Sequence, residues 1–216
     1  MAGAPRLSHD QLRTLDRLKP LCEALGLYLA GGTAIALHLG HRTSRDIDLF
    51  TRQRTADFEV VRGRFANLTG AEIDAFTETA LHGRVDMVPV DVVNYSYPLL
   101  CPTVEGPSGL AVASLEDLSV MKLAAIARRG IRRDFWDLYE ILRSGAIALP
   151  QALASYTRRY GVKDSDLYHV LRSLTFFDDA EADTIMPDGL TTERWRVVRQ
   201  YFLDHVPPLL RAYLVD

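Results

Sequence analysis

Apolar and polar residues alternate with two different periods along the first half of the chain. Leucines recur at helical spacing after Ser8, a suitable N-cap, and this pattern ends at Gly26. A two-residue period begins near residue 72, and Asp86-Met87 has the position of a hairpin turn within it. The pattern predicts helices at residues 8–25, 33–39 and 56–68, and strands at residues 27–30, 47–51, 81–85 and 88–95. We therefore expect this half to form an α/β unit with a mixed sheet.

The second half of the chain shows helical periodicity almost throughout. Glycines and prolines interrupt it, and they set the expected helix ends. Helices are predicted at residues 115–129, 133–143, 150–160, 165–174 and 192–205, with an acidic loop at 178–183 and a helix end before Pro207-Pro208. A Gly/Pro-containing segment at 105–113 separates the halves. We expect an α/β core at residues 1–110 and a C-terminal helical bundle at 111–216, packed on the core as one compact unit.

Composition places the chain among ordinary globular proteins. Of its 216 residues, 48% are hydrophobic and 25% are charged, which excludes disordered and collagen-like classes. The net charge of −3 provides no overall attraction to nucleic acid, so any anion site must be local. No apolar run is long enough to span a bilayer, and the first residues lack the apolar stretch of a signal peptide. We therefore expect a cytoplasmic protein with no membrane partner.

The segment 28–50 carries the clearest chemical signal. An apolar strand ends at Gly31-Gly32 and a helix follows at once, so backbone N–H groups and the positive helix terminus face outward without a Cβ in the way. This arrangement suits a phosphate. The next strand carries Asp46 and Asp48, whose spacing places both carboxylates on one face of the sheet. Two carboxylates about 4 Å apart repel by roughly 4 kcal/mol at an effective dielectric near 20, so we expect Mg²⁺ with phosphate oxygens between them.

Each of these motifs has a simpler explanation. Gly-Gly is often only a turn, and Asp-x-Asp is common at strand ends where the acids face water. One short helix separates the two motifs, so both chain reversals can meet at one cleft, and we favour a phosphate and metal site. Asp91 is a candidate third carboxylate of a two-metal site, because it interrupts a run of valines in a predicted inner strand. It would share a metal with Asp46 and Asp48, or else pair with an arginine.

A third candidate group lies on the first two helices of the second half. Lys122 falls within an apolar stripe and points inward, where its ammonium could bind the β- or γ-phosphate of a nucleoside triphosphate. On the next helix, Asp134 and Asp137 share a face. They could pair with Lys122 or Arg133, and one could accept a proton from an attacking hydroxyl. An ordinary interhelical salt bridge explains the two acids equally well.

Arginines gather beside both groups. A solvated surface explains any single arginine, but two clusters near one cleft could guide the phosphates of a nucleotide or of RNA. The clusters are Arg42, Arg45, Arg52 and Arg54 around the Asp-x-Asp strand, and Arg128, Arg129, Arg132 and Arg133 beside the predicted lysine site.

In combination, these motifs resemble a known family. Gly31-Gly32-Thr33, then Asp46-x-Asp48, then an isolated strand aspartate are similar to the signature of the DNA polymerase β-like nucleotidyltransferase superfamily. The fuller match consists of GGTAIALHLGHRTSRDIDLF, MKLAAIARRGIRRDFWDLYEIL and LTFFDDAE. It resembles the AbiEii/AbiGii abortive-infection toxin nucleotidyltransferases over roughly residues 15–205.

This resemblance implies a magnesium-dependent nucleotidyltransferase of a toxin–antitoxin system. Some toxins of the family add nucleotides to transfer RNA ends, which implies an RNA acceptor and a cognate antitoxin protein as partners. Related antibiotic nucleotidyltransferases modify small molecules instead, and a catalytically silent nucleotide-binding module is a further alternative. By the resemblance, Gly32 and Thr33 hold the triphosphate, Asp46 and Asp48 bind metal, and Lys122 with Asp134 or Asp137 completes the site.

Overall fold

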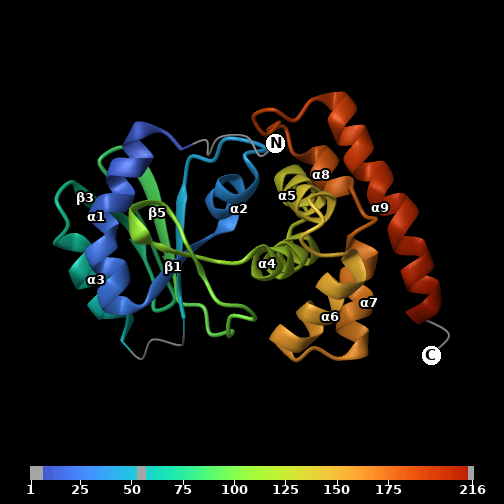
Figure 1. Cartoon of the computed structure of the whole chain (residues 1–216), viewed down its shortest axis with the longest axis horizontal. Coiled ribbons are helices and arrows are strands. Elements are labelled where there is room, and N and C mark those ends of the chain that lie inside the picture. The colour runs from blue at the N-terminus through green and yellow to red at the C-terminus, as the bar shows by residue number, and fades with distance from the viewer. Residues whose placement is uncertain (1–6, 53–56, 214–216) are drawn as a thin grey trace. The chain divides into compact units, whose positions relative to one another are not determined.

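The structure is a computed structural model that describes residues 7–52 and 57–213. The chain divides into two compact units, Met1–Ser114 and Leu115–Asp216, and each is described by itself (Figure 1). The first unit combines helices with a mixed sheet, and the second consists of helices. The expected α/β (α+β) fold class with a C-terminal helical region is therefore confirmed.

A seven-stranded sheet forms in the described part of the first unit, in the order β3-β4-β5-β2-β1-β7-β6. Its strands are β1 (Leu27–Ala30), β2 (Ile47–Thr51), β3 (Ala71–Phe76), β4 (Ala80–Val85), β5 (Val88–Val93), β6 (Val104–Glu105) and β7 (Ala111–Val112). Two neighbouring pairs, β2 with β5 and β1 with β7, are parallel, and the others are antiparallel. The sequence pattern did not predict β6 and β7, because strands of two residues are too short to show a period.

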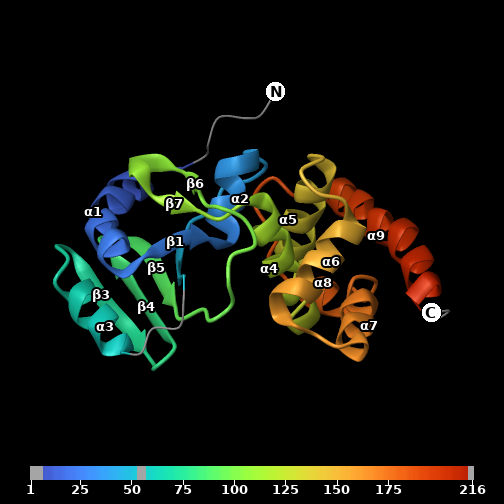
Figure 2. The same cartoon turned by 60° about the horizontal axis from the view of Figure 1, so that its bottom comes forward.

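The two faces of the sheet differ in burial. Along β2 and β5, apolar residues that include Leu49 and Val90 are fully buried, and the residues between them are partly exposed. Helices α1 (His9–Leu25) and α3 (Phe58–Ala66) lie on one side of the sheet and α2 (Gly31–Leu39) lies on the other (Figures 1 and 2). The alternation places Asp48 and Asp91 on the less buried face, as a period of two requires.

Helix α1 begins as its sequence predicts. The Ser8 hydroxyl accepts a hydrogen bond from the backbone N–H of Gln11, and the Gln11 side-chain oxygen accepts one from the backbone N–H of Ser8. This reciprocal capping satisfies two otherwise unpaired donors. The Gln11 amide nitrogen also donates to the backbone oxygen of Ser44 at 2.8 Å. The start of α1 therefore holds the loop that precedes β2.

The second unit contains the predicted helices and one more. They are α4 (Leu115–Arg128), α5 (Arg132–Arg143), α6 (Leu149–Tyr160), α7 (Asp164–Ser173), α8 (Asp178–Ala182) and α9 (Thr192–Tyr213). Helix α9 continues through Pro207 and Pro208, so the predicted helix end before them was wrong. Phe202 and Val206 on α9 are 0% exposed, and burial of this face outweighs the hydrogen bonds that the two prolines cannot donate.

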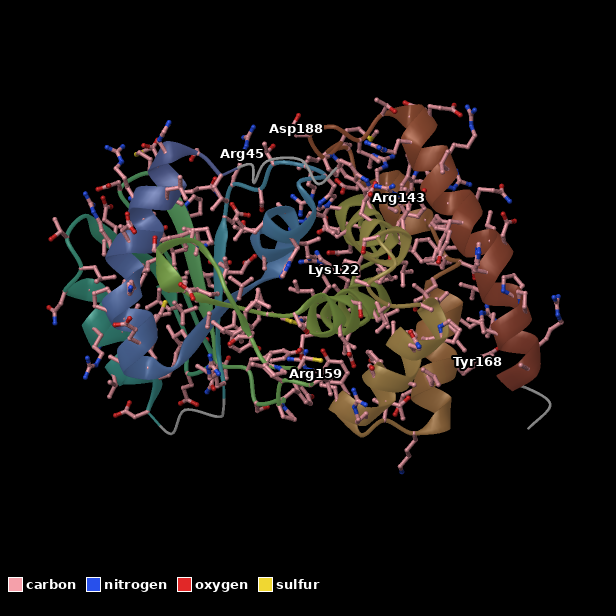
Figure 3. All side chains as sticks on the ribbon, viewed as in Figure 1. Arg45, Lys122, Arg143, Arg159, Tyr168 and Asp188 are labelled. Atoms are coloured by element: carbon pink, nitrogen blue, oxygen red, sulfur yellow. The ribbon has the colours of Figure 1, made fainter. Side chains whose placement is uncertain are left out.

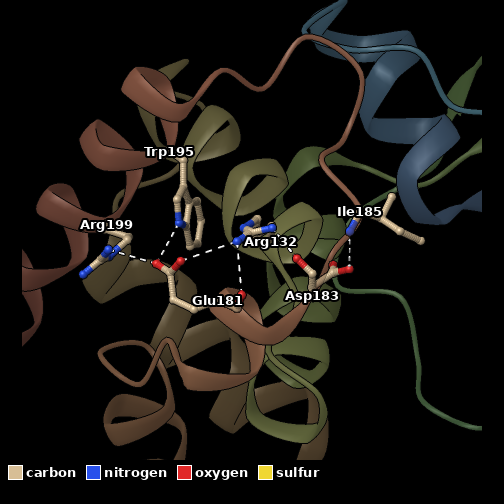
Figure 4. A network of polar contacts seen from close by, with 6 residues as sticks. All are labelled: Arg132, Glu181, Asp183, Ile185, Trp195 and Arg199. Carbon is tan, nitrogen blue, oxygen red and sulfur yellow. Dashed lines mark hydrogen bonds and ion pairs between the residues drawn. The ribbon is translucent and has the colours of Figure 1, made fainter.

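A polar network centred on Glu181 attaches α8 to its neighbours (Figure 4). Trp195 Nε1 and Arg199 Nη1 both donate to Glu181 Oε1, at 3.0 and 2.9 Å. Arg132 donates to the backbone oxygens of Glu181 and Asp183. The Trp195 hydrogen bond lowers the pKa of Glu181; burial opposes this change, and the charges of Arg199 and Arg132 support it. The segment predicted as an acidic loop is thus an anchored helix.

Candidate active site

The diglycine turn lies directly against the Asp-x-Asp strand. Gly31 begins α2 with φ of 64°, and a Cβ at this position would lie 2.0 Å from Asp48 Oδ2. A Cβ on Gly32 would lie 2.3 Å from Nη2 of Arg42. Position 31 therefore requires glycine for both its backbone conformation and the space that the carboxylate occupies. Gly31-Gly32 is more than a simple turn, because it brings the start of a helix against a carboxylate.

Thr33 connects the same two elements from inside. Its side chain is fully buried, and its hydroxyl donates to the backbone oxygen of Asp46. This bond joins the first turn of α2 to the residue that precedes β2. In this structure, the hydroxyl predicted to contact triphosphate holds the turn in place.

Two of the three predicted carboxylates are direct neighbours in the sheet. Asp48 on β2 and Asp91 on β5 are partners in the parallel ladder, and Asp46 lies just before β2. Neighbouring strands are about 4.8 Å apart, and two unit charges at that distance repel by about 3 kcal/mol at an effective dielectric near 20, before solvent screening. The sheet thus places the side chains of Asp48 and Asp91 next to each other, and Asp48 lies against the diglycine turn.

Asp91 pairs with a histidine that is not part of any of the predicted motifs. His82 on β4 is its ladder partner on the other side, and its Nδ1 lies 2.8 Å from Asp91 Oδ1. The arginine partner considered from the sequence is therefore replaced by an imidazole. The sequence contained the signal, because a two-residue turn at Asp86-Met87 places Val85 opposite Val88 and hence His82 opposite Asp91.

The carboxylates of Asp46, Asp48 and Asp91 offer the kind of ligand atoms that Mg²⁺ prefers. Carboxylate oxygens are hard ligands, and Mg²⁺ in phosphate-transfer sites takes one or two of them together with substrate phosphate oxygens. In the part of the chain that the structure describes, no group of three or more His, Cys, Asp or Glu side chains is arranged as a metal site by itself. A cation at Asp48 and Asp91 would therefore need oxygens from a phosphate or water as well.

Arg45 and Asp46 line a cavity of about 520 Å³ at the start of β2 and β5, and the described wall of this cavity does not include Asp48, Asp91 or the diglycine turn. Gln11, Ser44 and Pro89 are also part of its wall. Arg45 is exposed, extends from the loop before β2 (Figure 3), and forms no ion pair with another described residue. An exposed guanidinium in this position is free to bind phosphate. Arg54, of the same predicted cluster, lies outside the described residues.

In the second unit, Lys122 forms two buried ion pairs. Its ammonium lies 2.9 Å from Oδ1 of Asp134 and 2.9 Å from Oδ2 of Asp137. Arg129 also bonds to Asp134, with Nε 2.8 Å from Oδ2. Two positive charges, on Lys122 of α4 and on Arg129 just after it, therefore balance two negative charges on α5. The interhelical salt bridge considered from the sequence is present, and it involves Lys122 rather than Arg133.

The pKa directions agree with this pairing. Burial alone would lower the pKa of Lys122, but the charges of Asp137 and Asp134 outweigh it and raise the pKa. Burial would raise the pKa of Asp134, but Lys122 and Arg129 outweigh it and lower the pKa. Lys122 and Asp134 are therefore both charged at neutral pH.

Exposure distinguishes the lysine from its two acids. The side chain of Lys122 (labelled in Figure 3) is 9% exposed, whereas those of Asp134 and Asp137 are 0% exposed. An acceptor hydroxyl has no access to such a carboxylate in this structure, so both acids are placed to orient the lysine. Arg133 is exposed at the start of α5 and forms no ion pair with any other residue in the described ranges.

Among the described residues, no helix combines the length and the apolar character that a bilayer-spanning segment needs.

Comparison with known proteins agrees with the fold and with the motifs. The chain resembles MenT4, a nucleotidyltransferase toxin from Mycobacterium tuberculosis H37Rv, with a TM-score of 0.61 and 16% identity over 91% of this chain and 82% of that one. An uncharacterized protein of Aquifex aeolicus (strain VF5) is 28% identical over 199 residues, which cover 91% of this chain and 94% of that protein. The fold is thus that of a nucleotidyltransferase.

The family follows from a match over nearly the whole chain. Residues 13–214 match the family described as nucleotidyl transferase AbiEii toxin, type IV toxin–antitoxin system. The chain therefore belongs to the AbiEii family, and it is a nucleotidyltransferase toxin of a toxin–antitoxin system.

Proposed function

We propose that this protein transfers a nucleoside monophosphate from a nucleoside triphosphate to a hydroxyl of RNA, at a transfer RNA 3′ end. The observation that carries this proposal is the contact of Gly31 with Asp48, which in turn neighbours Asp91 across two parallel strands. A helix start without a Cβ suits phosphate, and adjacent carboxylates suit a divalent cation. Their combination fits a triphosphate with its cation better than it fits either ligand alone.

The residues of the first unit have defined tasks in this proposal. Gly31 and Gly32 present backbone N–H groups to the triphosphate, and Thr33 fixes their turn through the backbone oxygen of Asp46. Asp46, Asp48 and Asp91 would hold two Mg²⁺ ions, with further oxygens from the triphosphate or water. Such ions would supply positive charge to the reacting phosphate oxygens.

The reaction is a displacement at the α-phosphorus. The acceptor hydroxyl loses its proton to solvent, its oxygen forms a bond to phosphorus, the bond to the bridging oxygen breaks, and pyrophosphate leaves. Lys122 donates to the β- or γ-phosphate, while Asp134 and Asp137 position it. Exposed Arg45 and Arg133 contact phosphates of the nucleotide or of the RNA.

The choice of RNA rests on the exposed arginines Arg45 and Arg133 and on the family. The net charge of −3 does not attract RNA to the whole surface, so exposed arginines must do so locally. Membership of a toxin–antitoxin family implies a cognate antitoxin protein as a partner. We place the reaction in the cytoplasm, where nucleoside triphosphates and transfer RNA are both present.

Transfer of label to RNA tests this proposal. Purified protein is incubated with each α-labelled nucleoside triphosphate, Mg²⁺ and total RNA, beside the variants Asp48→Asn and Asp74→Asn. Asp74 is the matched control, because it lies on the same sheet and pairs with Arg84. We expect labelled transfer RNA with wild type and with Asp74→Asn, and a loss of about 100-fold or more with Asp48→Asn.

Other outcomes would contradict the proposed acceptor or the proposed activity. Mg²⁺-dependent label in a small molecule, and in neither RNA nor protein, would indicate an antibiotic-type transferase. Nucleotide that binds without any transfer would indicate a catalytically silent module.

A further inference from the structure

His82 belongs to the same row of side chains as the candidate metal ligands. Asp48 on β2, Asp91 on β5 and His82 on β4 are successive partners across three neighbouring strands. The contact between His82 Nδ1 and Asp91 Oδ1 is 2.8 Å, and the side chains are 51% and 37% exposed. The row therefore ends in the imidazole of His82, which contacts one carboxylate oxygen of Asp91.

The local backbone fixes this contact. The β4–β5 hairpin has a two-residue turn with Asp86 at φ of 53°, and Asp86 is held by an ion pair with Arg17 at 2.8 Å. On the other edge of β4, a Cβ on Gly83 would lie 2.4 Å from the backbone oxygen of Glu72. The strand that carries His82 is thus held closely on both sides, and its register with Asp91 cannot slip without breaking these contacts.

The neighbouring cation on β4 has other partners. Arg84 lies two residues after His82 and therefore on the same face. It forms ion pairs with Asp74, at 2.6 Å, and with Glu72. Arg84 therefore pairs with acids on β3, and Asp91 pairs with His82 instead.

We propose that His82 is a positioning residue for Asp91. By holding Oδ1, the imidazole fixes the orientation of the carboxylate and leaves the second oxygen for a divalent cation. This inference rests on the proposed function, because it assigns Asp91 to cation binding. Hydrogen-bonded partners of metal-binding side chains orient those ligands, and their loss weakens metal binding.

Mn²⁺ binding to the full chain, measured by calorimetry in the absence of nucleotide and again with a non-hydrolysable triphosphate, tests the inference. The variants are His82→Ala, His82→Asn and His82→Gln, with His9→Ala as the exposed histidine control. The Asn amide nitrogen occupies the place of Nδ1, whereas the Gln nitrogen occupies that of Nε2. We expect about tenfold weaker Mn²⁺ binding for Ala and Gln, and a change within about threefold for Asn and for the His9 control.

Three results would overturn the inference, and they can be told apart. If His82→Ala binds Mn²⁺ like wild type while Asp48→Ala does not, the cation site exists and His82 has no part in it. If Asp48→Ala and Asp91→Ala also bind like wild type, the proposed cation site itself is wrong. Equal loss for Ala, Gln and Asn, with unchanged circular dichroism, would show that the Nδ1 contact is not what matters.

Discussion

Gly31 and Asp48 share a space that has no room for a Cβ. A methyl group at position 31 would lie 2.0 Å from Oδ2 and 2.7 Å from Cγ of Asp48, and the backbone there has a positive φ. The contact brings a helix start that suits phosphate against a strand whose carboxylates suit a divalent cation. Each motif alone is a weak signal, and the contact between them places both in one candidate site.

Gly31→Ala should therefore impair nucleotide transfer more than Gly32→Ala does. The substitution strains the backbone and displaces the Asp48 carboxylate, so we expect transfer to fall about 100-fold and the free energy of unfolding to fall by about 2 kcal/mol. Gly32 has no positive φ, and a Cβ there would meet the ends of the Arg42 and Ser44 side chains, with Nη2 at 2.3 Å and Oγ at 3.3 Å, rather than a carboxylate. Transfer assays and urea unfolding of both variants measure the difference.

Gly63→Ala is the control for this pair. Gly63 lies inside α3 with no atom within 4 Å of a Cβ, so alanine should stabilise the protein by up to about 1 kcal/mol. Equal activity of Gly31→Ala and Gly32→Ala would show that Asp48 does not need its present position.

The buried ion pairs of α4 and α5 should make stability depend on acid pH. The pKa of Asp134 is lowered from its ordinary value of 3.8, so its contribution is present above that pH and is lost as the pH falls through the lower pKa of the folded state. At pH 7, Asp134→Asn should lower the free energy of unfolding by about 3 kcal/mol. The difference from wild type should narrow below pH 3.8.

The matched control is Asp10→Asn, which removes one partner of the exposed pair with Arg13. Surface pairs contribute about 0–1 kcal/mol, so its effect should be small at every pH. Urea unfolding between pH 7 and pH 3 compares the two variants. A similar loss for both would contradict the buried charge balance around Lys122.

Arg132 should protect the segment after α8 from proteolysis. Its guanidinium donates to the backbone oxygens of Glu181 and Asp183, and Arg132→Ala removes these bonds. We expect cleavage between residues 183 and 190 to become about tenfold faster, as loss of roughly 1.4 kcal/mol of local stability implies. Arg196→Ala, which removes an exposed pair with Glu193, should leave the rate unchanged. Limited proteolysis with mass spectrometry measures both rates.

The two cysteines should differ in reactivity. Burial raises the pKa of Cys22 to about 12, and the thiol is enclosed in α1. Cys101 is partly exposed. We expect a thiol reagent to modify Cys101 in the native protein and Cys22 only after unfolding. Labelling of both thiols at equal rates would contradict the packing of α1.

Periodicity predicted much of the fold, and it failed where segments were short or tertiary packing prevailed. Ser8 and Gly26 marked the limits of α1 well, because a cap and a stop are local signals. Pro207 gave a wrong helix end, because the tendency of proline to end a helix competes with burial of the α9 face around Val206. Strands of two residues gave no signal.

The candidate site was predictable in part for similar reasons. Period-2 geometry placed Asp48 correctly on the face opposite Leu49, and strand pairing then made Asp91 its neighbour. The sequence did not reveal that Arg129 rather than Arg133 would pair with Asp134, since that depends on how the chain turns after α4. His82 was missed, although the hairpin turn determined its position opposite Asp91.

Transfer of a nucleoside monophosphate is tested most directly by comparing label from the α- and γ-phosphates. Wild type should transfer label to RNA from an α-labelled nucleoside triphosphate and not from a γ-labelled one, because pyrophosphate leaves. Asp48→Asn should lower this transfer by about 100-fold or more without loss of folded structure. Label that enters RNA from the γ-phosphate, or an Asp48→Asn variant as active as wild type, would show that the protein does not transfer a nucleoside monophosphate in this way.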